Sequence, residues 1–121
     1  MKLIILGSPR TKKNSIRAFK RVGRTMVLPS TAACDWTKSA VLQLQQQWKW
    51  APLERPISMN AQVFRERKVG DLGNYLAAIC DALETANVVT NDKWILSFDG
   101  SRLQSDPSNP RVEIVLSELA I

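Results

Sequence analysis

Two carboxylates mark the ends of one segment of the chain, GDLGNYLAAICDALETANVVTND (residues 70–92). Asp71 precedes an apolar stretch with helical spacing, and Asp92 closes the segment after a second apolar run. The chain contains no histidine, which excludes imidazole acid–base chemistry, histidine-bound zinc and a Ser-His triad. Carboxylates that hold Mg²⁺ are another route to phosphodiester cleavage, because the metal lowers the pKa of its bound water. Asp71 and Asp92 are therefore candidate metal ligands.

Both aspartates also suit a structural role. Aspartate is a favoured helix N-cap, and Asp71 with Asn74 three residues later resembles a capping pair. Asp92 can in the same way open the helical turn DKWI. Capping and metal binding do not exclude each other, so both interpretations stay open for each residue.

The positive charge of the chain is concentrated near its N-terminus. The net charge of the 121-residue chain is +6, and no acidic residue precedes Asp35. A segment of one sign repels itself unless a polyanion neutralises it, so nucleic acid is the partner we expect; a solvated basic loop is the alternative. The candidate phosphate-binding residues of this segment are Arg10, Lys12, Lys13, Arg17, Lys20, Arg21 and Arg24. Arg65, Arg67 and Lys68 precede Asp71 and are candidates near a scissile phosphate.

Hydrophobic periodicity indicates which elements must position these residues. Alternating or continuous apolar runs predict strands, and apolar residues at three- and four-residue steps predict helices. The expected order is a strand over 2–6, a loop over 7–24, a strand over 25–29, a helix over 32–48, a strand from 57, a helix over 71–86, a strand over 93–98, a loop over 104–110 and a strand over 111–119. We therefore expect one domain over residues 1–121 with a small mixed sheet and two main helices, an α/β (α+β) fold.

Further expectations follow from single residue types. No apolar run approaches the roughly 20 residues of a membrane span, and the apolar start is too short for a secretory signal, so we expect a cytoplasmic protein without membrane contact. Cys80 lies on the apolar stripe of the second helix and should be buried. The tryptophans could stack on bases, although Trp36 and Trp48 lie on the apolar stripe of the first helix and suit a core or dimer interface better.

Three stretches carry a resemblance to a known family. The stretch VGDLGNYLAAICDALETANVVTNDKWI resembles the core motif of the RusA family of Holliday-junction resolvases. GSPRTKKN is similar to the opening of that family, and FDGSRLQSDPSNPRVEIVLSE to its closing hairpin. The resemblance implies a homodimeric, Mg²⁺-dependent endonuclease. Such an enzyme binds four-way DNA junctions and makes paired nicks in recombination and repair, in the cytoplasm of a bacterium or as a phage-encoded activity.

The resemblance also assigns residues. Asp71 matches the first aspartate of the family and Asp92 the last, which implies that both bind metal and that they act in catalysis with Asn74. Asn14 matches the asparagine of the opening motif and joins the DNA-binding candidates. The departures from the family pattern are Gly73 at the second aspartate, Asn91 at the acid beside Asp92, Ala77 at a helical lysine and Gly70 at an arginine.

Gly73 removes a metal ligand, and three explanations compete. The chain could be a weakened or inactive descendant that still binds junctions; another carboxylate could substitute; or a one-base change from an aspartate codon could have inactivated it. Asp81 is the nearest substitute, but it lies two helical turns, roughly 10 Å, from Asn74, so a structural role suits it better. Whether Asp71 and Asp92 meet within one chain or across a dimer stays open, as does a basic nucleic-acid-binding regulator unrelated to nucleases.

Overall fold

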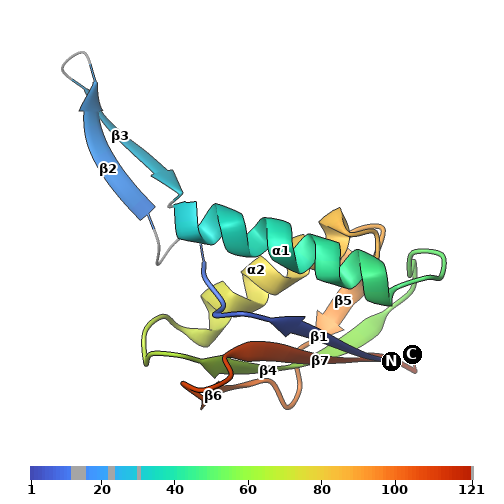
Figure 1. The fold of residues 1–121 in the computed structure, drawn as a ribbon. Helices are drawn as coiled ribbons and strands as arrows, with labels where there is room; N and C mark the ends of the chain where they lie inside the picture. Colours follow the sequence, from blue (N-terminus) through green and yellow to red (C-terminus); the bar gives the residue numbers. More distant parts are fainter. Residues whose placement is uncertain (12–15, 22–23, 30, 121) are drawn as a thin grey trace.

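The computed structural model describes the backbone of residues 1–11, 16–21, 24–29 and 31–120, and the side chains of residues 1–11 and 32–120. The elements of these residues follow the order β1 (Lys2–Leu6), β2 (Ile16–Arg21), β3 (Arg24–Pro29), α1 (Thr31–Gln47), β4 (Ile57–Arg65), α2 (Leu72–Thr85), a 3-10 turn η1 (Asp92–Trp94), β5 (Ile95–Ser97), β6 (Arg102–Ser105) and β7 (Arg111–Glu118) (Figure 1). The expected α+β fold with a mixed sheet and two main helices is confirmed.

The main sheet has five strands, ordered β1-β7-β4-β5, with β6 also paired to β4. β7 lies antiparallel to both β1 and β4, whereas β5 and β6 run parallel to β4 along different parts of its length. Both helices cover the same face of this sheet (Figure 1). This arrangement leaves the two ends of α2 close to the surface, where a site can form.

The hydrophobic core lies between the sheet and the two helices. On β4 the residues Ile57, Met59, Ala61 and Val63 are buried and alternate with half-exposed ones, which is the pattern of a strand with one covered face. The apolar faces of both helices pack onto these residues, and Cys80 is buried among them as expected. The periodic spacing of apolar residues in the sequence predicts this layer, because a strand or helix that is covered on one face carries apolar side chains on that face.

The outer edge of β1 is covered by two side chains of α1. The amide of Gln47 donates to the carbonyl of Ile4 (2.7 Å) and accepts from its N–H (2.9 Å). One turn earlier, the amide of Gln43 donates to the carbonyl of Leu6 (3.0 Å) and accepts from its N–H (2.7 Å). Each glutamine therefore satisfies both polar groups of one residue, as a neighbouring strand would.

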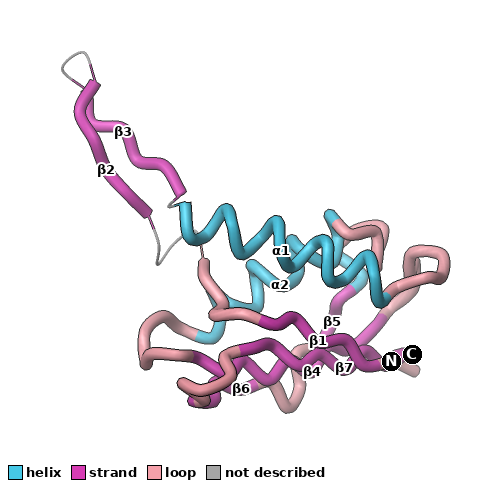
Figure 2. The backbone as a smooth tube through the Cα atoms, viewed as in Figure 1, coloured by secondary structure: helices cyan, strands magenta, loops and turns pink. Residues whose placement is uncertain are grey.

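A two-stranded sheet of β2 and β3 replaces much of the loop expected over residues 7–24, so that expectation is wrong from Ile16 to Arg21 and at Arg24. The two strands pair antiparallel, with Ile16 opposite Pro29 and Arg21 opposite Arg24. Figure 2 shows this hairpin extending away from the main sheet and the helices. Lysine and arginine interrupt the apolar pattern of β2 and hide the strand in the sequence, whereas cross-strand pairing with β3 stabilises it.

A second difference concerns β6, which includes Gln104 and Ser105 of the loop expected over residues 104–110. Four residues are too few to show a period, and the strand depends on its parallel pairing with Gln62–Arg65 of β4. In the part of the chain that the structure describes, no helix is long and apolar enough to cross a bilayer.

Candidate active site and DNA-binding surface

Asp71 is the N-cap of α2, which confirms the predicted capping pair. The backbone N–H of Asn74 donates to Oδ1 of Asp71 (2.9 Å), and the side-chain amide of Asn74 donates to Oδ2 (3.1 Å). The Asp71 side chain is exposed, and each of its oxygens keeps a lone pair beyond these bonds. The capping bonds thus orient the carboxylate and leave it able to bind a cation.

The turn before Asp71 is held by two side chains. Tyr75 donates its hydroxyl to the carbonyl of Val69 (2.8 Å), and the Arg65 guanidinium lies 3.3 and 3.4 Å from the carbonyls of Val69 and Gly70. Gly70 has a φ of 82°, a left-handed conformation that favours glycine over the arginine of the family pattern. Burial raises the pKa of Tyr75, which keeps its hydroxyl protonated and able to donate. These contacts fix the direction from which the chain enters α2.

Nothing in the structure requires a glycine at position 73. Gly73 is exposed and does not have a positive φ. A Cβ added there would meet only Oδ1 of Asp71, at 3.7 Å, which is an ordinary van der Waals distance. A side chain at position 73 would therefore point into open space beside the Asp71 carboxylate, so the second aspartate of the family pattern fits this backbone.

Asp92 lies beside the C-terminal half of α2. Its backbone N–H donates to Oε1 of Glu84 (3.1 Å), and Asp92 together with Asp81 contributes to raising the pKa of Cys80 to about 12, after the larger effect of burial. The suggestion that Asp92 caps the following turn is wrong, because Asn91 is the N-cap and accepts from the N–H of Lys93 (2.9 Å). The Asp92 side chain is exposed and makes no hydrogen bond or ion pair with another described residue.

The two aspartates lie beside different parts of α2. The helix has 14 residues and therefore rises about 20 Å between the N-cap Asp71 and its last turn, near which Asp92 lies. The described residues contain no group of three or more acidic, histidine or cysteine side chains that could hold a metal ion. Asp71 thus lies at the N-terminal end of α2, whereas Asp92 lies beside its C-terminal half.

A cavity of about 430 Å³ runs along the face of α2 between these ends. Asn74, Ala77 and Asp81 line it from α2, and Arg10 and Thr37 line it from the opposite wall. Its lining thus includes one guanidinium, which can bind a phosphate, and the carboxylates of Asp81 and Glu84, which can bind a cation. Ala77 leaves room where the family pattern has a lysine, so Arg10 is the basic residue of the cavity wall.

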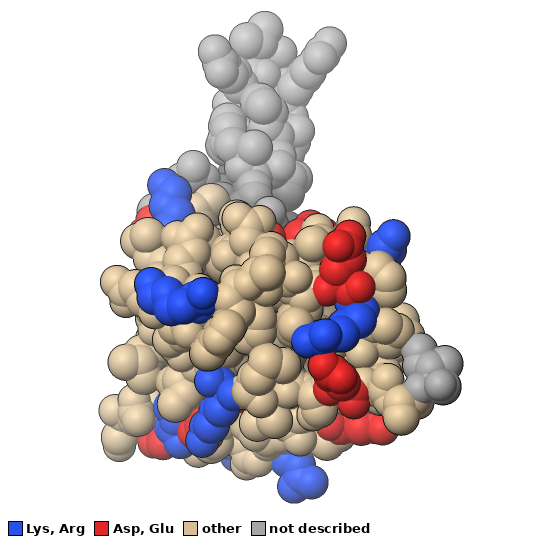
Figure 3. Space-filling model, turned by 90° about the vertical axis from the view of Figure 1, so that its right-hand side faces the viewer, with Lys and Arg blue, Asp and Glu red and all other residues tan. Residues whose placement is uncertain are grey.

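The other DNA-binding candidates are divided between described and undescribed parts of the chain. Arg67 and Lys68 are exposed in the turn before α2. Arg17, Lys20 and Arg21 lie on β2 and Arg24 on β3, but their side chains lie outside the described residues, as do Lys12, Lys13 and Asn14 entirely. Figure 3 shows one face of the body, on which acidic side chains lie mainly toward the right and basic side chains lie both among them and toward the left. The basic residues before Asp71 therefore remain the best-described candidates for phosphate contacts.

Two residues of the site were not singled out from the sequence. Glu84 lines the cavity and holds the backbone of Asp92, and it lies three residues after Asp81, so helical spacing could have placed both on one face. Thr37 reaches the same cavity from α1. No local pattern points to Thr37, because only the packing of α1 against α2 brings it there.

The chain therefore combines a small α+β fold with exposed carboxylates beside one helix and exposed basic residues in the turn that leads into it. A family model described as "Endodeoxyribonuclease RusA" matches residues 7–117. The chain belongs to this family, whose members are endodeoxyribonucleases that act on DNA junctions. A search of curated proteins found no match.

Proposed function

We propose that this protein is a Mg²⁺-dependent, structure-selective endodeoxyribonuclease that resolves four-way junctions by paired nicks, and that Gly73 weakens its activity. Recombination and repair in the cytoplasm of a bacterium, or during phage infection, is its proposed setting. The observation that carries the proposal is the family match over residues 7–117, together with Asp71 and Asp92 at the family's first and last aspartate positions. The order Asp71, Asn74 and Asp92 is retained although the second aspartate is not.

Asp71 and Asp92 are suited to hold a divalent ion. Both side chains are exposed, the Asp71 carboxylate is already oriented by Asn74, and the Asp92 carboxylate is not committed to another described residue. When bound, Mg²⁺ supplies a water of lowered pKa and offsets charge on the attacked phosphate. The residues of the chain itself do the rest: Arg10, Arg67 and Lys68 bind the DNA backbone, and Tyr75 keeps the turn before Asp71 in place.

A homodimer can bring the two aspartates together. Because Asp71 caps the start of α2 and Asp92 lies beside its C-terminal half, we propose that Asp71 of one protomer and Asp92 of the partner subunit complete each site. Two such sites related by a twofold axis suit a four-way junction, whose arms have the same symmetry. Paired nicks then follow from the geometry of the dimer.

Complementation between inactive variants tests this arrangement. In a Gly73→Asp background, Asp71→Asn and Asp92→Asn should each abolish nicking when alone. If sites are shared, a mixed dimer has one site with both substitutions and one intact site, so mixing and reassociating the variants restores a single nick in one strand. If each site lies within one protomer, no mixture recovers activity, and the shared-site arrangement is wrong.

A junction assay tests the activity itself. We expect a synthetic four-way junction to be nicked in Mg²⁺ and bound without nicking in Ca²⁺. Equal affinity for the junction and for plain duplex would instead favour a general nucleic-acid-binding protein and contradict the proposal.

A non-catalytic junction-binding protein is the second candidate. Gly73 and Ala77 favour it, since both replace charged residues of the family pattern and Ala77 lines the cavity where the lysine would lie. Tight junction binding with no nicking at any Mg²⁺ concentration would support this candidate over the nuclease.

A further inference from the structure

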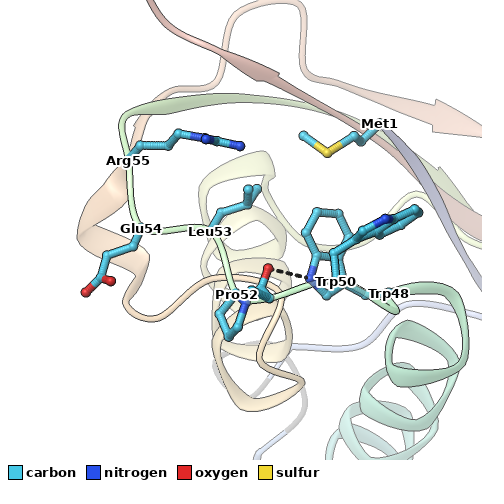
Figure 4. A pocket seen from close by; sticks show the side chains of 8 residues that line it. Met1, Trp48, Trp50, Pro52, Leu53, Glu54 and Arg55 are labelled. Carbon is cyan, nitrogen blue, oxygen red and sulfur yellow. Dashed lines mark hydrogen bonds between the residues drawn. The ribbon is translucent and has the colours of Figure 1, made fainter.

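A second cavity lies beyond the C-terminal end of α1, away from the face of α2. Its volume is about 630 Å³, which falls in the range of small-molecule sites. Figure 4 shows the two indole rings of Trp48 and Trp50 on one side, Arg55 and Met1 extending toward each other on the other, and Leu53 between them. None of these residues has a part in the proposed cleavage.

The two tryptophans form a fixed platform with one open surface. Trp48 is 7% exposed, and its indole N–H donates to the carbonyl of Ala51 (3.3 Å), which holds the turn after α1. Trp50 is 67% exposed and packs edge-to-face on Trp48, with ring centroids 5.1 Å apart and planes at 70°. A large aromatic ring held in this way and left in water is an available stacking surface.

The charges around the platform suit one class of ligand. Nε of Arg55 contacts Glu118 (2.9 Å), which anchors the guanidinium and leaves its terminal N–H groups for another acceptor. A planar nucleobase offers a face to Trp50 and carbonyl or ring-nitrogen acceptors to Arg55. Because the chain belongs to a family that acts on DNA, a base of the bound DNA fits better than an uncharged peptide or an acyl chain.

The cavity is connected to the segment that carries Asp92. The N–H of Leu53 donates to the carbonyl of Val88 (2.8 Å), and the N–H of Thr90 donates to the carbonyl of Leu53 (3.0 Å). Leu53 forms a parallel bridge with Val89, three residues before Asp92. A base that contacts Leu53 is therefore bound by a residue that is hydrogen-bonded to the segment leading to Asp92.

We infer that this cavity binds an unpaired DNA base, stacked on Trp50 and hydrogen-bonded by Arg55. Paired bases cannot enter, because their faces are covered by neighbours and their edges by the opposite strand. The cavity thus adds a preference for DNA with unpaired bases to the phosphate contacts, which read neither the bases nor their pairing directly. This inference depends on the DNA binding of the proposed function but not on cleavage.

The test measures binding in EDTA, where no metal-dependent nicking can occur. The probes are a duplex with one unpaired 2-aminopurine and the fully paired duplex of the same sequence. Stacking on an aromatic ring contributes a factor of about 5 to 100 in affinity. We expect Trp50→Ala to reduce the preference for the unpaired probe about tenfold and to abolish the change in 2-aminopurine fluorescence, without changing affinity for the paired duplex.

Matched variants separate stacking from a loss of folding. Trp50→Phe keeps a ring and should retain most of the preference. Leu42→Ala removes another exposed apolar side chain, 61% exposed and outside the cavity, and should change neither affinity. Trp50 is mostly exposed, so its replacement should lower the melting temperature of the protein only by the small amount expected for loss of its contact with Trp48 and leave the transition cooperative.

Each outcome bears on the inference. The inference is overturned if Trp50→Ala binds the unpaired probe with an unchanged preference. It is also overturned if Trp50→Ala loses self-association in sedimentation, because that result would show that a second copy of the chain fills the cavity. If the preference depends on Trp50 but no junction is nicked in Mg²⁺, the inference stands and the nuclease proposal fails. If junctions are nicked equally well with and without Trp50 and the preference is unchanged, the proposal stands and the inference fails.

Discussion

The two ends of α2 are built in different ways. At its N-terminus, Asp71 is oriented by two hydrogen bonds from Asn74, and Arg67 and Lys68 precede it. Along its C-terminal half lie the carboxylates of Asp81, Glu84 and Asp92, with no basic residue in the last helical turn. The helix dipole favours a carboxylate at the first end and disfavours carboxylates at the second.

The carboxylate of Asp71 is therefore stabilised by its local contacts, whereas the carboxylate of Asp92 has no such stabilising contact. Asp71 contributes to stability whether or not it binds a metal, so its presence alone is weak evidence for catalysis. Asp92 caps nothing, since Asn91 has that role, and its charge lies near other negative charges. Asp92 is therefore the stronger indication of a function that requires negative charge, and the following predictions test that contrast.

The largest effect is expected from restoring a carboxylate beside Asp71. Gly73→Asp should raise Mg²⁺-dependent nicking of a four-way junction about 100-fold or more, because a metal ligand contributes several kcal/mol to transition-state stabilisation. The backbone accepts the side chain, whose Cβ would lie 3.7 Å from Asp71 Oδ1. Single-turnover cleavage measures the change.

Gly73→Ala is the control for this substitution. It should raise the free energy of unfolding by about 0.5–1 kcal/mol through helix propensity and leave nicking unchanged. Equal nicking rates in the alanine and aspartate variants would show that the ligand set lies elsewhere.

The next effect concerns Cys80, whose pKa is raised by burial and by the negative charges beside the C-terminal half of α2. Its folded pKa of about 12 lies above the ordinary thiol value of 9.0, so the folded protein retains a proton that the unfolded chain loses. Stability from this group is therefore complete below pH 9 and decreases as the pH rises toward 12, by at most about 1.4 kcal/mol per pH unit. Denaturant unfolding at pH 8 and pH 10 measures the slope.

Cys80→Ala isolates the thiol from the lysines and the tyrosine that titrate in the same range. The variant is less stable at every pH because it leaves a small cavity, but its stability should decrease less between pH 8 and pH 10. Parallel pH profiles of the two proteins would contradict the raised pKa.

A smaller effect distinguishes the two aspartates directly. Asp71→Ala should lower the free energy of unfolding by about 1 kcal/mol through loss of the N-cap, whereas Asp71→Asn should retain most of it. Asp92→Ala should change it by less than about 0.5 kcal/mol, because Asn91 caps the turn. Urea unfolding measures these changes. If Asp92→Ala lowers the free energy of unfolding as much as Asp71→Ala does, the contrast between the two aspartates is wrong.

The smallest effect is expected at Glu84. Glu84→Ala removes the acceptor for the backbone N–H of Asp92 and should cost about 0.5 kcal/mol of stability, while Glu84→Gln keeps an oxygen acceptor and should cost less. If Glu84 positions Asp92, nicking in the Gly73→Asp background should decrease in the alanine variant and be retained in the glutamine variant. A decrease that is the same in both would point to the charge of Glu84 instead.

Local patterns predicted the parts of this fold that depend on nearby residues. The helices and β4 follow from apolar spacing, and the capping of α2 follows from Asp71 and Asn74 three residues apart. β2 was missed because its basic residues resemble a loop, and its order depends on β3. At Asp92, two adjacent residues can both cap, and only the backbone conformation selects Asn91.

The separation of the two aspartates could only be bounded from the sequence. The length of the helix predicts that the chain does not return as far as Asp71 by residue 92. The path of residues 86–91, however, depends on the hydrogen bonds that Val88 and Thr90 make with Leu53, which lies far away in the sequence. The cavity along α2 likewise requires Thr37 of α1 and Arg10 after β1. Such tertiary contacts leave no short-range signature.

The glutamine pair on β1 has a consequence for assembly. Gln43 and Gln47 occupy the donors and acceptors of Ile4 and Leu6 that an incoming strand would need. The sheet therefore cannot extend from one molecule into the next through the edge strand β1, as it would in a fibril. A twofold pair of these molecules must therefore join through other surfaces, and its sheet cannot continue across the axis through β1.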